Sequence, residues 1–337
     1  MPKLRPKKNP KRKLRRQAEK TDKWEAVSES LFILVEVGSK LYKHRTYVEK
    51  SNDFEKMIEL VTRLNAIHIC DWSVGRIYAW RYGRWDTKSQ DDLQFEKQAE
   101  LYFDKADKLQ GIIITENFGR EYYLLSEKKE EIIQNMIDFL LKNQFGEEYS
   151  VIVSECDVMQ QSILFKNGFA FQTDADVTYT YSKDKIAFPD ISLPDGFTLS
   201  DQEKFKNMTA VEKQRFFSFN PNSEYSDVID KGYKHCRTNP LLIQALNIVL
   251  LDSNNTPISS CVGYLDKDNS LMEIEVVATK SGYENRGFAK IVICECIRKG
   301  IDFGVVEFSI SGWNEKTKRI YSSFGEPTIT KKFRFAR

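Results

Sequence analysis

Gly287 and the two cations near it, Arg286 and Lys290, have the types and spacing of an anion-binding site. The first-turn N–H groups of a helix have no partner within the helix, and the helix dipole places about half a positive charge there. A diphosphate lying across residues 285–290 could accept several of these N–H groups, and a glycine would let it approach the backbone closely. An ordinary strand–turn–helix connection would show the same single glycine, so the spacing alone leaves both interpretations open.

Two carboxylates, Glu273 and Glu275, precede this turn in an otherwise apolar run. Strand alternation would place both on one face, together with Val277 and Thr279. Burying an unpaired carboxylate is costly, so each either pairs with a cation on a neighbouring element or takes part in chemistry. Two acids close together would raise the pKa of one of them, which favours a general base near neutral pH.

The residue pattern predicts the elements that hold these side chains. Residues 271–278 form an apolar run with period 2, which predicts a strand. Residues 288–299 are apolar at helical spacing and end at Gly300, which predicts a helix with a C-terminal stop. The turn at 281–287 therefore delivers Gly287 to the start of the helix.

The segment ENRGFA at 284–289 resembles the acetyl-CoA-binding motif of the GCN5-related N-acetyltransferases (GNAT), Q/R-x-x-G-x-G/A. Residues 314–325, NEKTKRIYSSFG, resemble the next helix of that superfamily, N-x-x-A-x-x-L-Y-x-x-x-G. The chain departs from the first motif at Glu284, where the family has Gln or Arg. That change removes a side-chain contact to the diphosphate but leaves the backbone donors in place.

The resemblance implies that the second half of the chain binds acetyl-CoA and transfers its acetyl group to an amine. Tyr321 corresponds to the tyrosine that protonates the departing thiolate in many members. The general base lies eleven residues before the motif in some members, at Glu273, and nine before it in the tandem family, at Glu275. A backbone N–H at 277–279 would polarise the thioester carbonyl, and Asn314 would contact the cofactor or merely cap its helix. The implied cofactor-binding residues are Val277, Ala278, Thr279, Asn285, Arg286, Gly287, Phe288, Ala289, Lys290, Asn314 and Tyr321.

The order of predicted elements occurs twice, which indicates two copies of one fold. The first copy is predicted as a helix capped by residues 51–53, strands at 100–104, 109–115 and 121–125, a helix at 132–141, a strand at 150–154, a helix at 158–166 and a strand at 176–181. The second is predicted as a strand at 197–199, helices at 202–217 and 226–236, strands at 242–251 and 259–265, the elements described above, a strand at 305–310, a helix from 315 and a strand at 328–335. Gly111 and Gly168 are 57 residues apart, and the corresponding Gly263 and Gly325 are 62 apart.

This repetition resembles bacterial tandem members of the superfamily, whose first copy carries a W-x-x-x-R segment like WSVGR at 72–76. The first copy has LSEKKEEI at 125–132, with no glycine and three carboxylates at the helix start, and these would repel a diphosphate. We therefore expect an α/β (mixed α+β) protein of two tandem GNAT folds, each a mixed, mostly antiparallel sheet with helices on both faces. The first copy is expected to be degenerate.

Charge and turn residues predict three segments. Residues 1–20 carry ten Lys or Arg against one acid, so that +9 lies there and about −7 on the rest of a chain whose net charge is +2. The prediction is a disordered basic tail at 1–23, a degenerate GNAT-like domain at 24–188 and an acetyl-CoA-binding GNAT domain at 189–337, after the turn residues between Pro189 and Gly196. The tail could contact nucleic acid, the ribosome or an acidic membrane surface, or only solubilise the protein.

Six cysteines without a CxxC pair and three scattered histidines indicate neither a zinc site nor a disulfide framework. No apolar run approaches the ~18 residues of a membrane span, and no signal peptide is evident. The expectation is a soluble cytoplasmic protein without a metal, and the sequence does not indicate an oligomeric state.

The function that these residues predict is direct acetyl transfer from acetyl-CoA to the amine of a small molecule or peptide, in a ternary complex. The alternative is a non-catalytic acetyl-CoA-binding or scaffold protein whose basic tail contacts an acidic partner. Tyr321 and Asn314 favour the enzyme, whereas Glu284 and the tail favour the scaffold.

Overall fold

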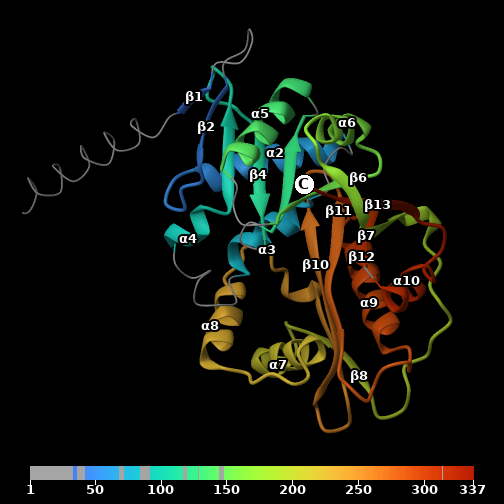
Figure 1. The fold of residues 1–337 in the computed structure, drawn as a ribbon. Helices are drawn as coiled ribbons and strands as arrows, with labels where there is room; N and C mark the ends of the chain where they lie inside the picture. The colour runs from blue at the N-terminus through green and yellow to red at the C-terminus, as the bar shows by residue number, and fades with distance from the viewer. Residues whose placement is uncertain are drawn as a thin grey trace, which may run out of the picture.

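The computed structural model describes residues 33–35, 42–67, 72–83, 92–116, 120–127, 129–143, 148–312 and 314–337. The basic tail expected at 1–23 lies outside the described residues. The strands of the described residues join in one mixed sheet of 13 strands, in the order β1-β2-β3-β4-β5-β6-β13-β7-β12-β11-β10-β9-β8. In Figure 1 the first half of the chain, blue to green, forms the upper part, and the second half, yellow to red, forms the lower part.

The first half contains most of the predicted elements at or near their predicted bounds. Strands β4 (Leu109–Thr115) and β6 (Ser150–Ser154) and helix α6 (Val158–Lys166) have the expected ends. Two strands and two short helices were not predicted, because their segments lack a clear apolar period. The remaining elements are β1 (Ile33–Val35), β2 (Tyr42–Thr46), α2 (Asp53–Ala66), α3 (Val74–Tyr82), α4 (Asp92–Glu96), β3 (Ala99–Phe103), β5 (Glu121–Ser126), α5 (Glu130–Asn143) and β7 (Ala170–Ser182).

The second half repeats this order. Its elements are β8 (Thr198–Asp201), α7 (Met208–Phe219), α8 (Asp227–Cys236), β9 (Asn247–Leu251), β10 (Pro257–Asp266), β11 (Leu271–Thr279), α9 (Phe288–Asp302), β12 (Glu307–Gly312), α10 (Glu315–Tyr321) and β13 (Thr328–Ala336). The helix predicted from 202 begins only at Met208, because the Asp201 carboxylate accepts the N–H groups of Glu203 and Lys204 and holds a turn there. The strand predicted from 242 begins at Asn247, after a 3-10 turn at Gln244–Leu246.

Helices cover both faces of the sheet in each half. In the first half α5 and α6 pack on one face, over Ile113 and Val151, and α2 and α3 pack on the other, over Ile112 and Ile152. In the second half α9 packs over a core that includes Met272 and Ile274, and α7 packs over Val249 and Leu251. Alternation along each strand sends neighbouring side chains to opposite faces, which explains this division.

The glycine correspondence has a structural basis. A Cβ at Gly111 would collide with Met136 of α5, and a Cβ at Gly263 would lie 2.6 Å from Met272 Sδ and only 3.0 Å from Cys296 Sγ of α9, so each glycine lets the central helix approach its strand. Gly168 and Gly325 both have left-handed φ, +84° and +107°. The duplicated mixed α/β fold predicted from the sequence is therefore confirmed.

The two halves exchange their last strands. The chain's final strand, β13, lies between β6 and β7, and β7 in turn pairs with β12 of the second half. Phe333 and Phe335 of β13 consequently pack with the first-half core under α5 and α6. The C-terminus lies at the centre of the molecule in Figure 1, next to β6 and β13, so each half is completed by a strand of the other.

Candidate active site

The start of α9 is formed by the turn that contains Gly287. Asn285 and Gly287 both adopt left-handed φ, 63° and 81°, which turns the chain sharply into the helix. Gly287 is the N-cap, and no side chain of the described residues forms a capping hydrogen bond at this helix start. An anion at this helix start could therefore accept the first-turn N–H groups and would interact favourably with the helix dipole.

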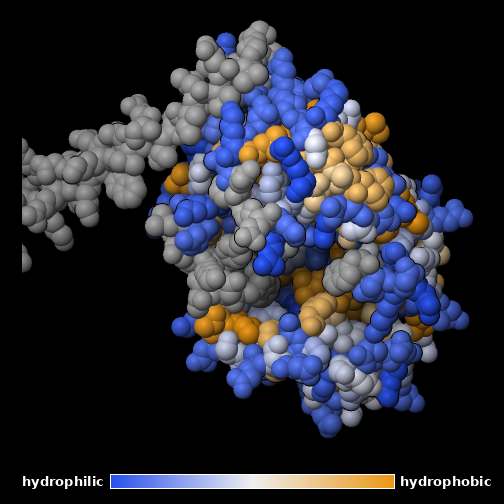
Figure 2. Space-filling view, in the orientation of Figure 1, coloured by the Kyte–Doolittle hydropathy of each residue, from blue (hydrophilic) through white to orange (hydrophobic). Residues whose placement is uncertain are grey.

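A cavity of about 670 Å³ begins at this helix start and runs to α10. It lies where β11 and β12 separate, since these parallel strands pair only over Leu271–Glu273 and Glu307–Ser309. Beyond Glu273 the edge of β11 that faces β12 makes no ladder bonds, which leaves backbone donors near residues 277–279 beside the cavity. Figure 2 shows that the surface is hollowed between the upper and lower parts of the molecule, with apolar side chains inside the hollow.

Most of the predicted cofactor-binding residues line this cavity together. They are Val277, Ala278, Thr279, Asn285, Gly287, Phe288, Ala289, Lys290, Asn314 and Tyr321. Arg286 does not line it, because its guanidinium stacks over the ring of Tyr283, 5.2 Å from the ring centroid. Glu284, the residue that departs from the family motif, accepts the N–H of Gly282 at 2.7 Å and so supports the turn.

The predicted alternation along β11 is wrong after Glu275. Val276 has a φ of +54°, and the pairing with β10 shifts between Ser260 and Val262, so β11 carries a bulge at this point. One extra residue reverses which face the following side chains occupy. Val277 therefore packs against the core under α9, whereas Glu273 and Glu275 point to the opposite face.

The two glutamates line a second cavity, of about 580 Å³, between the halves. Its walls come from α3 of the first half and from α7, α8, β10 and β11 of the second. Val276 lines this cavity and Val277 lines the first one, so the bulge separates the two spaces. A β-branched residue at positive φ is strained, and such strain is typical of functional sites.

Glu275 has an unusual electrostatic setting. Burial and the neighbouring Glu273 raise the pKa of Glu275 to about 8, against the opposing effect of Arg76. Its one hydrogen bond is from the N–H of Val276, at 3.3 Å, and no cation of the described residues forms an ion pair with it. The pairing alternative therefore fails for Glu275, and a carboxyl group with this pKa suits proton transfer near neutral pH.

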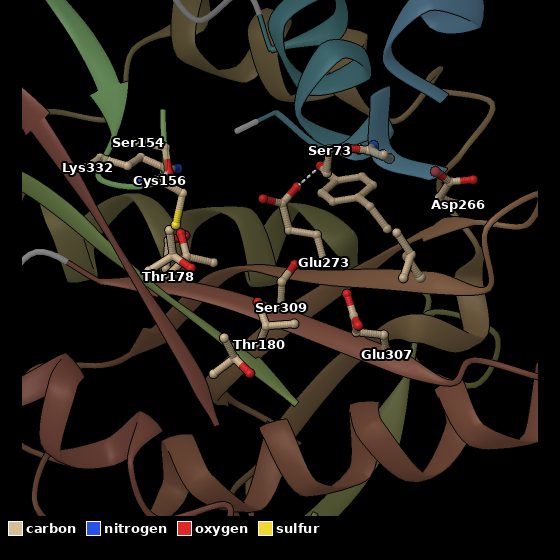
Figure 3. A pocket seen from close by; sticks show the side chains of 17 residues that line it. Ser73, Ser154, Cys156, Thr178, Thr180, Asp266, Glu273, Glu307, Ser309 and Lys332 are labelled. Carbon is tan, nitrogen blue, oxygen red and sulfur yellow. Dashed lines mark hydrogen bonds between the residues drawn. The ribbon is translucent and has the colours of Figure 1, made fainter. Parts of the chain in front are cut away.

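Glu273 has a partner on the first half, since the Ser73 hydroxyl donates a hydrogen bond to it. Figure 3 shows this bond at the edge of a third cavity of about 380 Å³. Hydroxyl side chains rise into that cavity from strands of both halves, among them Thr178, Thr180 and Ser309. The second and third cavities meet at Tyr264, Glu273 and Ser311, which line both.

Tyr321 lies at the inner end of the first cavity, with 5% of its surface exposed. Burial raises the pKa of its hydroxyl, and the nearby Glu275 raises it further, so the phenol stays protonated. Its backbone carbonyl accepts a hydrogen bond from the Tyr181 hydroxyl, and its ring packs edge-on against Tyr179 at 6.0 Å. Tyr321 is therefore a rigidly held, protonated phenol that lines the first cavity.

Asn314 caps its helix, which is one of the two roles expected of it. Its side chain accepts the N–H of Thr317 at 2.9 Å and forms a capping box at the start of α10. Asn314 also lines the first cavity, so capping does not remove it from the site.

The matching position in the first half is acidic. Helix α5 begins with Glu130 and Glu131 in its first turn, directly after Glu127. Among the described residues, Glu127 pairs with Lys129 at 3.2 Å and with Arg63 at 3.6 Å, so these two cations are already engaged.

Sequence comparison gives no relative, because neither the scan against protein-family models nor the search of curated proteins finds a match. Comparison with solved structures finds proteins of similar fold. The fold is similar to a tandem GNAT protein from the clavulanic acid biosynthesis pathway (TM-score 0.56, 6% identity, 87% of this chain and 98% of that one). It is also similar to a GNAT-family acetyltransferase from Colwellia psychrerythraea (0.55, 13%, 88% and 100%) and to a GCN5-related N-acetyltransferase from Sphaerobacter thermophilus (0.52, 12%, 87% and 95%). The chain therefore has the tandem fold of the GCN5-related N-acetyltransferases.

The described residues contain no group of three or more His, Cys, Asp or Glu side chains that could hold a metal ion. No helix among them has the length and apolar character needed to cross a membrane.

Proposed function

We propose that the second half binds acetyl-CoA and transfers its acetyl group directly to an amine held between the halves. The observation that carries this proposal is the cavity that joins the uncapped start of α9 to Tyr321 along the separated strands β11 and β12. The diphosphate would lie on the first turn of α9, with Lys290 adding counter-charge. The pantetheine arm would follow residues 277–279 to Tyr321.

The amine would enter from the second cavity, on the other side of the bulge. Its nitrogen attacks the thioester carbonyl carbon while Glu275, or else Glu273, accepts the amine proton. A backbone N–H near 277–279 would stabilise the oxyanion. The C–S bond then breaks, and the Tyr321 hydroxyl protonates the leaving thiolate.

Only the second half is proposed to bind the cofactor. The acidic start of α5 would repel a diphosphate, and among the described residues Arg63 and Lys129 are already paired with Glu127. The scaffold alternative predicts the same binding without any acetyl transfer.

The test is calorimetric titration of the full chain with acetyl-CoA, followed by a thiol-release assay over a panel of amines and peptides. We expect a stoichiometry near one and amine-dependent thiol release. A stoichiometry near two would contradict the degenerate first half. Tight binding without thiol release on any amine would instead favour the scaffold.

A further inference from the structure

The cavity between the halves is lined by several charged side chains, most of which neutralise each other. Arg76 donates to Glu116 at 2.7 Å, and Arg237 donates to Glu212 at 3.1 Å. Glu121 pairs with Arg334, and Asp176 lies 3.9 Å from Lys332. These pairs leave one cation and two carboxylates of the cavity wall without an ionic partner among the described residues.

The remaining cation is Arg215 on α7, with 6% of its surface exposed. Its guanidinium donates only to neutral acceptors: Ser260 at 2.9 Å, the Asn247 amide oxygen at 2.6 Å and the Cys261 carbonyl at 3.5 Å. Its Nη1 donates to no described group, and no carboxylate of the described residues lies within 4.0 Å of it. A buried guanidinium without a counter-ion is costly unless a bound anion completes it.

Arg215 stays charged despite this setting. Burial lowers its pKa, but an arginine begins from a value so high that it remains protonated at neutral pH. Glu212, one helical turn earlier, does not neutralise it, because Arg237 already holds that carboxylate and burial raises the pKa of Glu212 to about 7.

The remaining carboxylates, Glu275 and Glu273, belong to β11. Tyr264 of β10 lies opposite Glu273 across the two strands, and it lines the same cavity as Arg215 and Glu275. The cavity therefore has a guanidinium on its α7 wall and two carboxyl groups on its β11 wall.

We infer that the acceptor is an amine that also carries a carboxylate, with Arg215 binding the carboxylate and Glu275 receiving the amine beside the thioester. This inference rests on the proposed function for the role of the amine end. The Nη1 N–H groups, which no described group accepts, are the donors that a carboxylate oxygen could take, and a hydrogen bond between two charged groups is stronger than a neutral one. A purely cationic amine would leave Arg215 uncompensated, and a neutral one would leave both walls unsatisfied.

The first experiment measures binding without turnover. The full chain is saturated with CoA, which has no acetyl group to transfer, and titrated with α-, β- and γ-amino acids, each paired with its carboxamide. We expect at least one amino acid to bind about 30-fold or more tightly than its carboxamide, as for a buried charge pair. A panel in which no amino acid is preferred over its carboxamide overturns the inference.

Variants identify the residue responsible. Arg215→Met should remove the preference for the carboxylate while keeping acetyl-CoA affinity, and Arg215→Lys should keep part of the preference. Lys213→Met is the matched control, because Lys213 is exposed on the same helix and its loss changes the net charge equally. If Arg215→Met still prefers the amino acid over its carboxamide, Arg215 does not bind the carboxylate. If Arg215→Met does not fold, the preference of the wild type and its size in Arg215→Lys test the same point.

The second experiment separates this inference from the proposed function. It measures kcat/KM for acetyl transfer to the same paired panel. Carboxylate binding that depends on Arg215 without any transfer supports the binding site and contradicts the acetyltransferase. Transfer that is equally fast to amino acids and carboxamides supports the acetyltransferase and overturns the acceptor class.

Discussion

At the scale of single residues, the proposed chemistry depends on two side chains, Tyr321 and Glu275, whose pKa values are raised by burial. Tyr321 is held by packing and by its own backbone carbonyl, so its ring position does not depend on the hydroxyl. Glu275 has a raised pKa because it sits beside Glu273 in an enclosed space. Tyr321→Phe and Glu275→Gln can therefore test these roles with little change in the size of either side chain.

Tyr321→Phe should keep acetyl-CoA affinity and lower kcat about 100-fold or more, because the ring still packs but the thiolate loses its proton donor. Calorimetry gives the affinity, and thiol release gives the rate. Tyr179→Phe is the control, since that ring touches Tyr321 without lining the cofactor cavity. Full activity in Tyr321→Phe would exclude it as the proton donor.

The pH dependence of the rate reports on Glu275. A base with a pKa of about 8 gives kcat/KM a rising limb that levels off above that pH. Glu275→Gln should shift this limb to the pKa of the acceptor amine itself and reduce the rate most below it, because only the neutral amine then reacts. If Glu273→Gln rather than Glu275→Gln moves the limb, Glu273 is the base.

The same pKa makes a prediction about stability. In the unfolded chain Glu275 ionises near pH 4.5, whereas in the folded protein it stays protonated up to about pH 8. The unfolded state therefore binds fewer protons across this window, so Glu275 makes the free energy of unfolding fall as pH rises. Thermal melts should show that Glu275→Gln gains stability over wild type at pH 8.5 but not at pH 4; a gain of equal size at both pH values would contradict the raised pKa.

At the scale of elements, the start of α9 and the bulge in β11 define the site. The helix supplies uncapped N–H groups, and the bulge turns Val277 toward one cavity while Glu275 faces another. A regular strand would put both on one face and leave the acid beside the pantetheine arm. The bulge therefore has the proposed cofactor site on one side and the proposed acceptor site on the other, so that the two can meet at it.

Gly287→Glu should weaken acetyl-CoA binding about 100-fold or more, because it adds a negative charge where the diphosphate would lie. The matched control is Gly304→Glu at the opposite end of α9. Gly304 has nearly the same left-handed φ, +86° against +81°, and open space around it, so both variants carry a similar backbone strain. Calorimetry should show weak binding for Gly287→Glu alone, and equal losses in both variants would mean that strain rather than charge is responsible.

At the scale of the whole molecule, strand exchange joins the halves into one sheet. Phe335, on the chain's last strand, is 1% exposed in the first-half core and packs against Phe165 and Phe171. The cavity between the halves depends on this joining, because its walls come from both.

Phe335→Ala should lower the free energy of unfolding by about 3–5 kcal/mol, as for other buried phenylalanines. Hydrogen exchange should accelerate in β6 of the first half, although the substitution is near the C-terminus. Ile329→Ala on the same strand is the control, because 52% of Ile329 is exposed. Faster exchange confined to the second half would contradict the exchanged strand order.

The sequence by itself determined the duplicated order of elements, the strand–turn–helix at 271–299 and the position of Gly287. These features depend on local periodicity, on glycine and on helix-terminus chemistry, all of which act over a few residues. Only the tertiary structure decided the bulge at Val276, the exchange of β7 and β13 and the cavity between the halves, because each depends on pairing between segments far apart in the chain. Arg215 shows both contributions, that of the sequence and that of the tertiary structure. The sequence carries its signal, since Met208, Val211 and Arg215 follow helical spacing on the buried face of α7, but only the assembled fold reveals a buried guanidinium without a counter-ion.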